Sequence, residues 1–81
     1  MITYKTLQTY VKAEPFRPFR IHMASGKFFD IRHPEMVKPT KTCVVIYFYT
    51  SDDPEVPDHW DTASLLLIEN ISFLDAPVSK T

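Results

Sequence analysis

Apolar residues recur at helical spacing near the start of the chain. Leu7 and Val11 stand at i and i+4, as neighbours on one face of a helix do. Thr3 lies just before this pattern and can cap the first turn with its hydroxyl. Pro15 ends the pattern, because the residue before a proline avoids helical backbone angles. The sequence therefore predicts a short helix within residues 1–14, which must pack on the rest of the domain because such a short helix is marginal alone.

Around Gly26, apolar and polar residues alternate on both sides of a short turn, which predicts a β-hairpin. A two-residue loop would place Ile21 opposite Asp30 and would mix apolar with charged residues on one face. A three-residue loop over residues 24–26 separates the two faces, and it puts Gly26 at the left-handed position that ends such loops. The predicted register therefore pairs Phe19 with Ile31, Arg20 with Asp30, Ile21 with Phe29 and His22 with Phe28.

Two consecutive Pro-Phe-Arg triplets link the helix to this hairpin. Each proline favours extended backbone, and an extended repeat of three residues places Phe16 and Phe19 on one side and Arg17 and Arg20 on another. The segment is expected to form a fixed crossing between helix and strand. The alternative is that the arginine pair contacts a phosphate or a peptide-like partner.

Residues 42–49, TCVVIYFY, have the strongest strand pattern in the chain, because nearly all of them are β-branched or aromatic. Both faces are apolar, so this strand is expected to be central, or bent in a small barrel, or covered on its second face by the helix or a partner. One face carries Val45, Tyr47 and Tyr49, and these are the candidate oligomer interface. Pro34 interrupts the chain between the hairpin and this strand.

The second half of the chain alternates between breaks and strands. Residues 50–58 are an acidic loop broken by prolines, and residues 59–64 and 68–74 are predicted as strands. Between these strands, the three leucines at 65–67 are too apolar to lie in open solvent. They predict either a tight helical turn or a continuation of the strand.

Together these elements predict one domain of the α+β class that is mostly β. It has a helix within residues 1–14, a β-roll over residues 15–75 and a loose tail at residues 76–81. The roll is expected to be a bent antiparallel sheet of about five strands. A domain of 81 residues has a thin core because it buries only about 60% of its unfolded surface, so a further layer from a partner would stabilise it.

Charge is unevenly distributed along the chain, although the formal net charge is only −1. The first half is basic and the second half is acidic. The basic half offers candidate contacts to nucleic acid or to an acidic partner. These are Arg17, Arg20, Lys27 and Arg32. The favoured expectation is that the two halves fold against each other and that their charges largely cancel.

The sequence carries no sign of a membrane span or of a secretion signal. No apolar run approaches the roughly 20 residues that a membrane helix needs, and the N-terminus lacks the basic and apolar regions of a signal peptide. The single cysteine, Cys43, cannot form an internal disulfide, so a cytoplasmic protein is expected. Because Cys43 lies within an apolar strand, it is expected to be a buried small hydrophobe and no nucleophile.

Patterns that carry chemistry are sparse. A single glycine excludes the glycine-rich phosphate loops and the dinucleotide-binding motif. His22, His33 and His59 show no metal-ligand spacing, and the acidic loop lacks the central glycine of a calcium loop. Trp60 is expected to lie over the core as a lid, with a stacking platform as the alternative. We predict no catalytic residue, no metal, no cofactor and no enzymatic activity.

Several short strings in this chain resemble a family of short uncharacterised bacterial proteins. They are AEPFRPF at residues 13–19, Ile21-His22, Gly26, His33-Pro34-Glu35 and Leu65-Leu66-Leu67. No activity is known for that family, so the resemblance implies no functional residues. The order of elements is also similar to that of small Sm-like and Src-homology-3-like barrels. In that layout a helix comes first and a short helical turn precedes the last strand.

Two functions fit these patterns. The first is a non-enzymatic protein-interaction module that forms a homo-oligomer through Val45, Tyr47 and Tyr49. The alternative is an Sm-like nucleic-acid-binding protein, in which the basic first half contacts phosphates while neighbouring aromatic side chains stack on bases. Self-association is the favoured prediction, and a pI near 6.2 weighs against nucleic acid.

Overall fold

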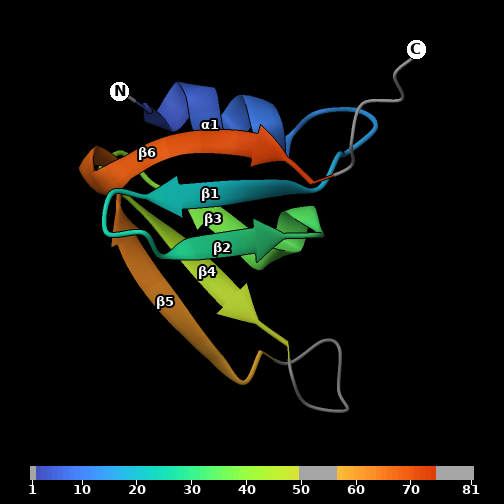
Figure 1. The fold of residues 1–81 in the computed structure, drawn as a ribbon. Helices are drawn as coiled ribbons and strands as arrows, with labels where there is room; N and C mark the ends of the chain where they lie inside the picture. The colour runs from blue at the N-terminus through green and yellow to red at the C-terminus, as the bar shows by residue number, and fades with distance from the viewer. Residues whose placement is uncertain (1, 50–56, 75–81) are drawn as a thin grey trace.

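The computed structural model describes residues 2–49 and 57–74, which hold one helix and six strands (Figure 1). They are α1 (Tyr4–Val11), β1 (Phe19–Met23), β2 (Phe28–Ile31), β3 (Val37–Pro39), β4 (Cys43–Phe48), β5 (His59–Ser64) and β6 (Ile68–Phe73). Two short 3₁₀ helices, η1 (Pro34–Met36) and η2 (Leu65–Leu67), precede β3 and β6. The predicted class, α+β and mostly β, is confirmed.

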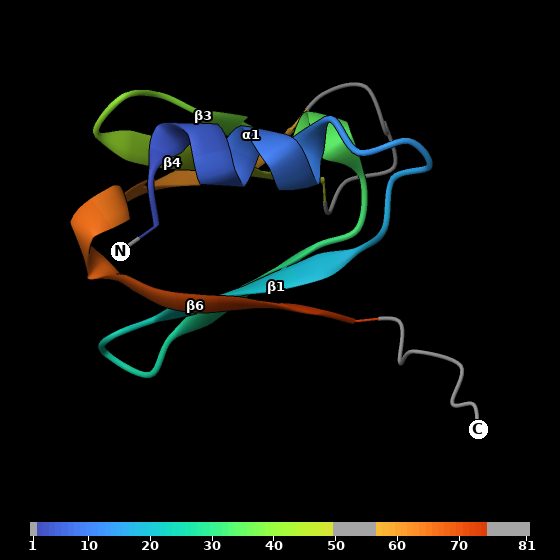
Figure 2. The ribbon, with the colours of Figure 1, turned by 90° about the horizontal axis from the view of Figure 1, so that it is seen from above.

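The six strands form two antiparallel sheets of three strands, with the orders β2-β1-β6 and β3-β4-β5. Figure 2 shows the sheets as two layers, with α1 lying along the layer that holds β3 and β4. The prediction of one bent sheet of about five strands was wrong in this respect, and over the described residues the sheets do not close into a barrel. Strand β2 ends at Ile31, and Pro34, which has no N–H to continue a ladder, begins η1, where the backbone turns.

Helix α1 begins where the sequence predicts. Thr3 is its N-cap, and the Thr3 hydroxyl accepts a hydrogen bond from the N–H of Thr6 at 3.2 Å. The helix ends at Val11, before the predicted end at residue 14, because the chain must take up extended geometry ahead of Pro15. Leu7 is fully buried, and α1 packs against β3.

The first hairpin has the predicted register. Phe19 pairs with Ile31, Arg20 with Asp30, Ile21 with Phe29 and His22 with Phe28. The N–H of Met23 donates to the carbonyl of Lys27 at 2.8 Å, which closes the three-residue loop. Gly26 has a φ of +96°, which is the left-handed geometry expected at the end of that loop.

Strand β4 is the central strand of its sheet, which was one of the expectations for residues 42–49. Val44 and Ile46 are fully buried, whereas Val45 and Cys43 are only partly buried. The alternation of a strand therefore gives β4 one face toward the core and one face outward. Cys43 lies on the outward face and is only partly buried, so the prediction that it is a buried side chain was wrong.

The three leucines of η2 form a helical turn, which decides between the two predicted alternatives. Ser64 caps this turn, because its hydroxyl accepts a hydrogen bond from the N–H of Leu66 at 3.3 Å. Leu65 is buried, but Leu66 is 70% exposed and Leu67 is 57% exposed. The expectation that all three avoid solvent was wrong, because a single 3₁₀ turn directs its side chains to different sides.

The core lies between the two sheets and beneath α1. Its fully buried side chains are Leu7, Phe19, Ile21, Ile31, Val44 and Ile46. The rings of Phe29 in β2 and Phe48 in β4 have centroids 6.3 Å apart, so aromatic contact also joins the two sheets.

No helix in the described part of the chain is long and apolar enough to cross a membrane. Residues 50–56 of the predicted acidic loop, and the predicted tail at residues 76–81, lie outside the described residues.

Candidate functional site

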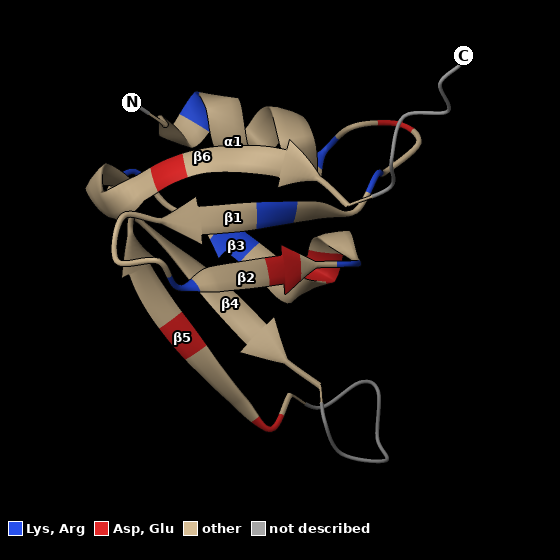
Figure 3. Cartoon of the chain, viewed as in Figure 1, with Lys and Arg blue, Asp and Glu red and all other residues tan. Residues whose placement is uncertain are grey.

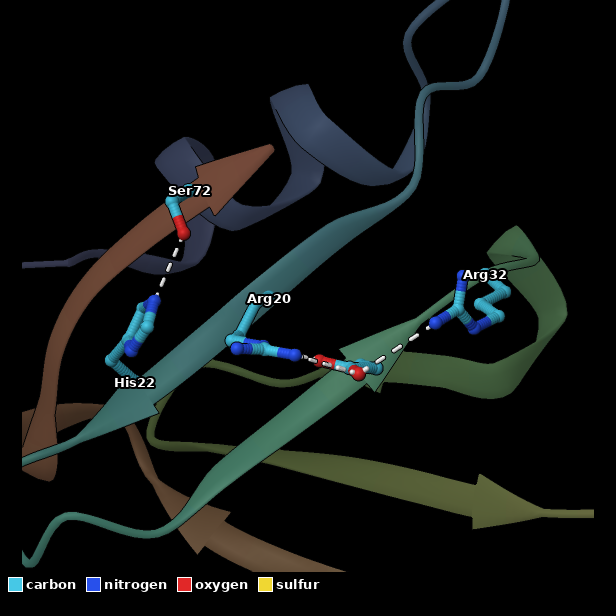
Figure 4. A network of polar contacts seen from close by, with 5 residues as sticks. Arg20, His22, Arg32 and Ser72 are labelled. Atoms are coloured by element: carbon cyan, nitrogen blue, oxygen red, sulfur yellow. Dashed lines mark hydrogen bonds and ion pairs between the residues drawn. The ribbon is translucent and has the colours of Figure 1, made fainter. Parts of the chain in front are cut away.

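Two of the four predicted cationic contacts, Arg20 and Arg32, meet at one carboxylate. Nε of Arg20 lies 2.6 Å from Oδ1 of Asp30, and Nη2 of Arg20 lies 3.1 Å from Oδ2. Nη2 of Arg32 lies 3.8 Å from the same Oδ2 (Figure 4). Hydrogen bonding from Arg20 lowers the pKa of Asp30 below its ordinary value, and the same bond raises the pKa of Arg20.

The other two cations lie elsewhere. Nζ of Lys27 contacts Oδ2 of Asp61 in β5 at 3.3 Å. The guanidinium of Arg17 stacks over the ring of Phe73 at 3.8 Å from its centroid. The predicted basic cluster is therefore divided among three places. The Lys27–Asp61 pair joins the basic half of the chain to the acidic half.

Acidic and basic residues are interspersed over the sheets (Figure 3). Figure 3 shows basic residues on β1 and β3, and acidic residues on β2, β5 and β6. On the outward face of β1 and β2, the ring of Phe28 is 50% exposed and carries the Arg20 guanidinium at 4.1 Å from its centroid. This face combines an aromatic ring with cations, but Asp30 already binds Arg20.

The histidines and the cysteine do not come together. Nε2 of His22 lies 2.9 Å from Oγ of Ser72 (Figure 4), whereas the ring of His59 stacks on Phe48 at 4.7 Å between centroids. His33 is exposed at the start of η1. Within the described ranges, no three His, Cys, Asp or Glu side chains lie close enough to hold a metal ion.

An apolar surface does come together on the outward face of β4 and β5. The register places Tyr47 of β4 opposite Trp60 of β5, and Val45 opposite Thr62. Trp60 is 61% exposed. We call the side chains of Cys43, Val45, Tyr47, Trp60, Thr62 and Ser64 the outer face.

The outer face contains two of the three predicted interface residues. Tyr49 follows the end of β4, and its hydroxyl donates to the carbonyl of Glu35 at 3.5 Å. The prediction of Trp60 as a lid over the core was wrong, because the even-numbered positions of β5 point outward. The β4–β5 register shows where Trp60 lies, because it pairs Trp60 with Tyr47, a residue of the predicted oligomer interface.

The free edge of β5 borders the outer face. Among the described residues, β5 pairs only with β4. The N–H of Leu65 donates to the carbonyl of Thr42 at 3.0 Å at the end of this ladder. Because alternate residues of an antiparallel strand bond to the partner, the odd-numbered residues of β5 bond to β4. The main-chain groups of Trp60, Thr62 and Ser64 therefore face the free edge.

A groove of about 330 Å³ runs along this edge and separates β5 from the β1–β2 hairpin. The Lys27–Asp61 ion pair spans the groove. One end is closed where the N–H of Ala24 donates to the carbonyl of Leu67 at 2.8 Å. Across this groove the hairpin contacts β5 through the Lys27 side chain, and in the described residues the β5 edge has no strand paired to it.

A further groove, of about 580 Å³, lies between the end of α1 and the end of β6. Tyr10, Arg17 and Phe73 line it, and the rings of Tyr10 and Phe73 have centroids 5.5 Å apart. Its polar lining also includes the hydroxyls of Thr6 and Thr9 and the carboxylate of Glu14.

No protein-family model matches this chain, and searches of curated proteins and of solved structures found no match either. The outer face and the β5 edge are therefore the features of the molecule that bear on its function.

Proposed function

We propose that this protein is a small non-enzymatic interaction module that associates with itself through the β5 side of the β3-β4-β5 sheet. The observation that carries the proposal is Trp60, which is 61% exposed beside Tyr47 on a sheet face. Exposed aromatic side chains that cluster in this way are typical of protein interfaces, where tryptophan and tyrosine supply much of the binding energy. The lone Cys43 supports a cytoplasmic setting for the module.

The composition of the outer face supports a second copy as the partner. None of its six side chains carries a charge, and the nearest charged neighbour on the same side of the sheet is Lys38, across from Val45. In a two-fold interface the same patch of both copies lies at the contact, whether the copies meet face to face or side by side. An uncharged surface can lie there without like-charge repulsion, so self-association costs little electrostatic energy.

The test is sedimentation or light scattering over a series of protein concentrations. We expect the mass to rise from monomer to dimer with concentration, and the change Trp60→Ala to weaken the dimer by at least about tenfold. The matched control is Phe28→Ala, because Phe28 is also an exposed aromatic on a strand but lies on the other sheet. A wild-type protein that stays monomeric at every soluble concentration overturns the proposal.

A second candidate is nucleic-acid binding with an Sm-like layout. The observation that favours it is the half-exposed ring of Phe28 with the Arg20 guanidinium above it, since bases stack on such platforms. The helix at the start and η2 before the last strand support the layout. Co-purified nucleic acid that raises the absorbance ratio at 260 and 280 nm and dissociates at high salt would favour this candidate.

A further inference from the structure

We infer that two copies of the chain pair antiparallel along the free edges of their β5 strands, about a two-fold axis at Thr62. The two three-stranded sheets then become one sheet of six strands. This inference rests on the self-association proposed above, and it specifies the partner segment and the register.

The β5 edge is the least protected of the sheet edges in the described ranges. β2 is short, contains Asp30 and is flanked by Lys27 and Arg32. β3 has three residues, ends in Pro39 and lies against α1. β6 carries Glu69 beside an irregularity in its pairing with β1. Short strands, charges, prolines and bulges are the features that keep edges from pairing.

β5 has little of this protection. It has six residues without proline, and its one acidic side chain, Asp61, points toward the groove and pairs with Lys27. Its free edge therefore offers three residues, Trp60, Thr62 and Ser64, whose main-chain donors and acceptors can bond to another strand.

The distribution of main-chain groups and charge selects the register. A two-fold axis at Asp61 would place the two Asp61 carboxylates directly opposite each other, which is repulsive. An axis at Ala63 would leave Trp60 outside the strand pair. An axis at Thr62 pairs Thr62 with its own copy and Trp60 with Ser64 of the second copy, and it places Asp61 opposite Ala63. All three edge-facing residues are then bonded without opposed charges.

Side-chain size agrees with this register. Trp60 would lie beside Ser64 of the second copy, and Cys43 of that copy is the next residue along the same row, because Cys43 and Ser64 are paired in the β4–β5 ladder. A large ring thus lies over two small side chains, and the outer faces of the copies form one surface. The five paired residues, 60–64, span only about 17 Å, so the interface is smaller than a standard one and should dissociate on dilution.

The first experiment changes the edge-facing N–H of Thr62. Thr62→Pro removes this donor while leaving the hydrogen bonds to β4 intact, because the bonds to β4 come from the odd-numbered residues. The matched control, Thr62→Ala, removes the hydroxyl and keeps the N–H. We expect proline to weaken the dimer by at least about tenfold in sedimentation, and alanine to change it by less than about threefold.

The second experiment keeps the inference testable if Thr62→Pro fails to fold. In a Cys43→Ser background, Thr62→Cys places two thiols across the axis at about 5.5 Å between Cα atoms, within the range of a disulfide. Ser64→Cys is the control, because its two copies would lie about 14 Å apart. We expect mild oxidation to cross-link the Thr62→Cys protein only.

The outcomes separate this inference from the proposed function. The β5 pairing is overturned if Thr62→Pro leaves the dimer affinity unchanged, or if Ser64→Cys cross-links more readily than Thr62→Cys. Either result is still compatible with self-association through another surface. A protein that stays monomeric at every concentration overturns both the β5 pairing and the proposed self-association. The same holds if the monomer binds an unrelated extended peptide at this edge.

Discussion

Arg20 of β1 and Asp30 of β2 stand directly opposite each other, and two guanidinium nitrogens contact the two carboxylate oxygens at 2.6 and 3.1 Å. The forked geometry of arginine matches a carboxylate in this way and fixes both side chains. Arg32 approaches the same carboxylate. The pair therefore reinforces the register of the hairpin on its outward face, while apolar contacts do so on the inward face.

We expect Asp30→Asn to destabilise the protein in a manner that depends on pH. The folded-state pKa of Asp30 is lowered, mainly by its hydrogen bonds to Arg20. Its stabilisation is therefore complete above the ordinary aspartate pKa of about 3.9 and is lost as pH falls through the lower folded-state value. Urea denaturation at several pH values measures this. Wild type should be more stable than Asp30→Asn at pH 7, and the difference should shrink below about pH 4.

The control for this prediction is Asp61→Asn, which removes the more exposed ion pair with Lys27. Exposed single-contact pairs contribute little, so its effect at pH 7 should be smaller. A difference between wild type and Asp30→Asn that stays constant from pH 7 down to strongly acidic pH would contradict the assignment.

Replacement of Gly26 in the β1–β2 turn should destabilise the protein through backbone strain, without a steric clash. Gly26 has a φ of +96°, yet a Cβ added there would meet no atom within 4 Å. We expect Gly26→Ala to lower the free energy of unfolding by about 1–2 kcal/mol, because residues with a Cβ disfavour this conformation. Denaturant titration provides the measurement, with Ser25→Ala in the same loop as control. Equal costs at the two positions would show that the strain is absent.

Leucine truncation should separate core from surface. Leu7 is the fully buried residue on the inner side of α1. Leu7→Ala is therefore expected to lower the free energy of unfolding by about 2–5 kcal/mol. Leu66 is 70% exposed, so Leu66→Ala should change the free energy of unfolding by less than about 0.5 kcal/mol. Chemical denaturation of both variants checks this. Similar losses would mean that η2 contributes more to the core than its exposure indicates.

The hairpin was predictable because local pattern alone determines it. Only one register separates apolar from charged residues, and the same register places Gly26 where a positive φ is needed. The pair formed by Arg20 and Asp30 follows directly from it. The cap at Thr3 and the start of α1 were likewise encoded within a few neighbouring residues.

The candidate site was only partly predictable, because it depends on pairing between separate segments. Val45 and Tyr47 were identified from the strand pattern, but the position of Trp60 depends on how β5 is aligned with β4 across a long connection. β5 has no clean alternation of apolar residues to indicate its outward side. The contact of Lys27 with Asp61 joins the β1–β2 loop to a strand of the other sheet, so no local pattern could indicate it.

The division into two sheets was missed for a related reason. β1 is the middle strand of its sheet, and one of its neighbours, β6, comes from the opposite end of the sequence, with Phe19 paired to Phe73. Sequence patterns identified both strands as strands. They contained no information that would place β6 beside β1.

The position of β6 beside β1 has a consequence for the order in which the chain folds. During synthesis, β1 and β2 emerge early, but a two-stranded hairpin is marginally stable in water. The neighbouring β3-β4-β5 meander connects strands in sequence order and can assemble before β6 has left the ribosome. Closing the first sheet requires a contact between residues far apart in sequence, and such contacts form slowly. The newly made chain should therefore keep the main-chain groups on one side of β1 without a partner strand until β6 arrives.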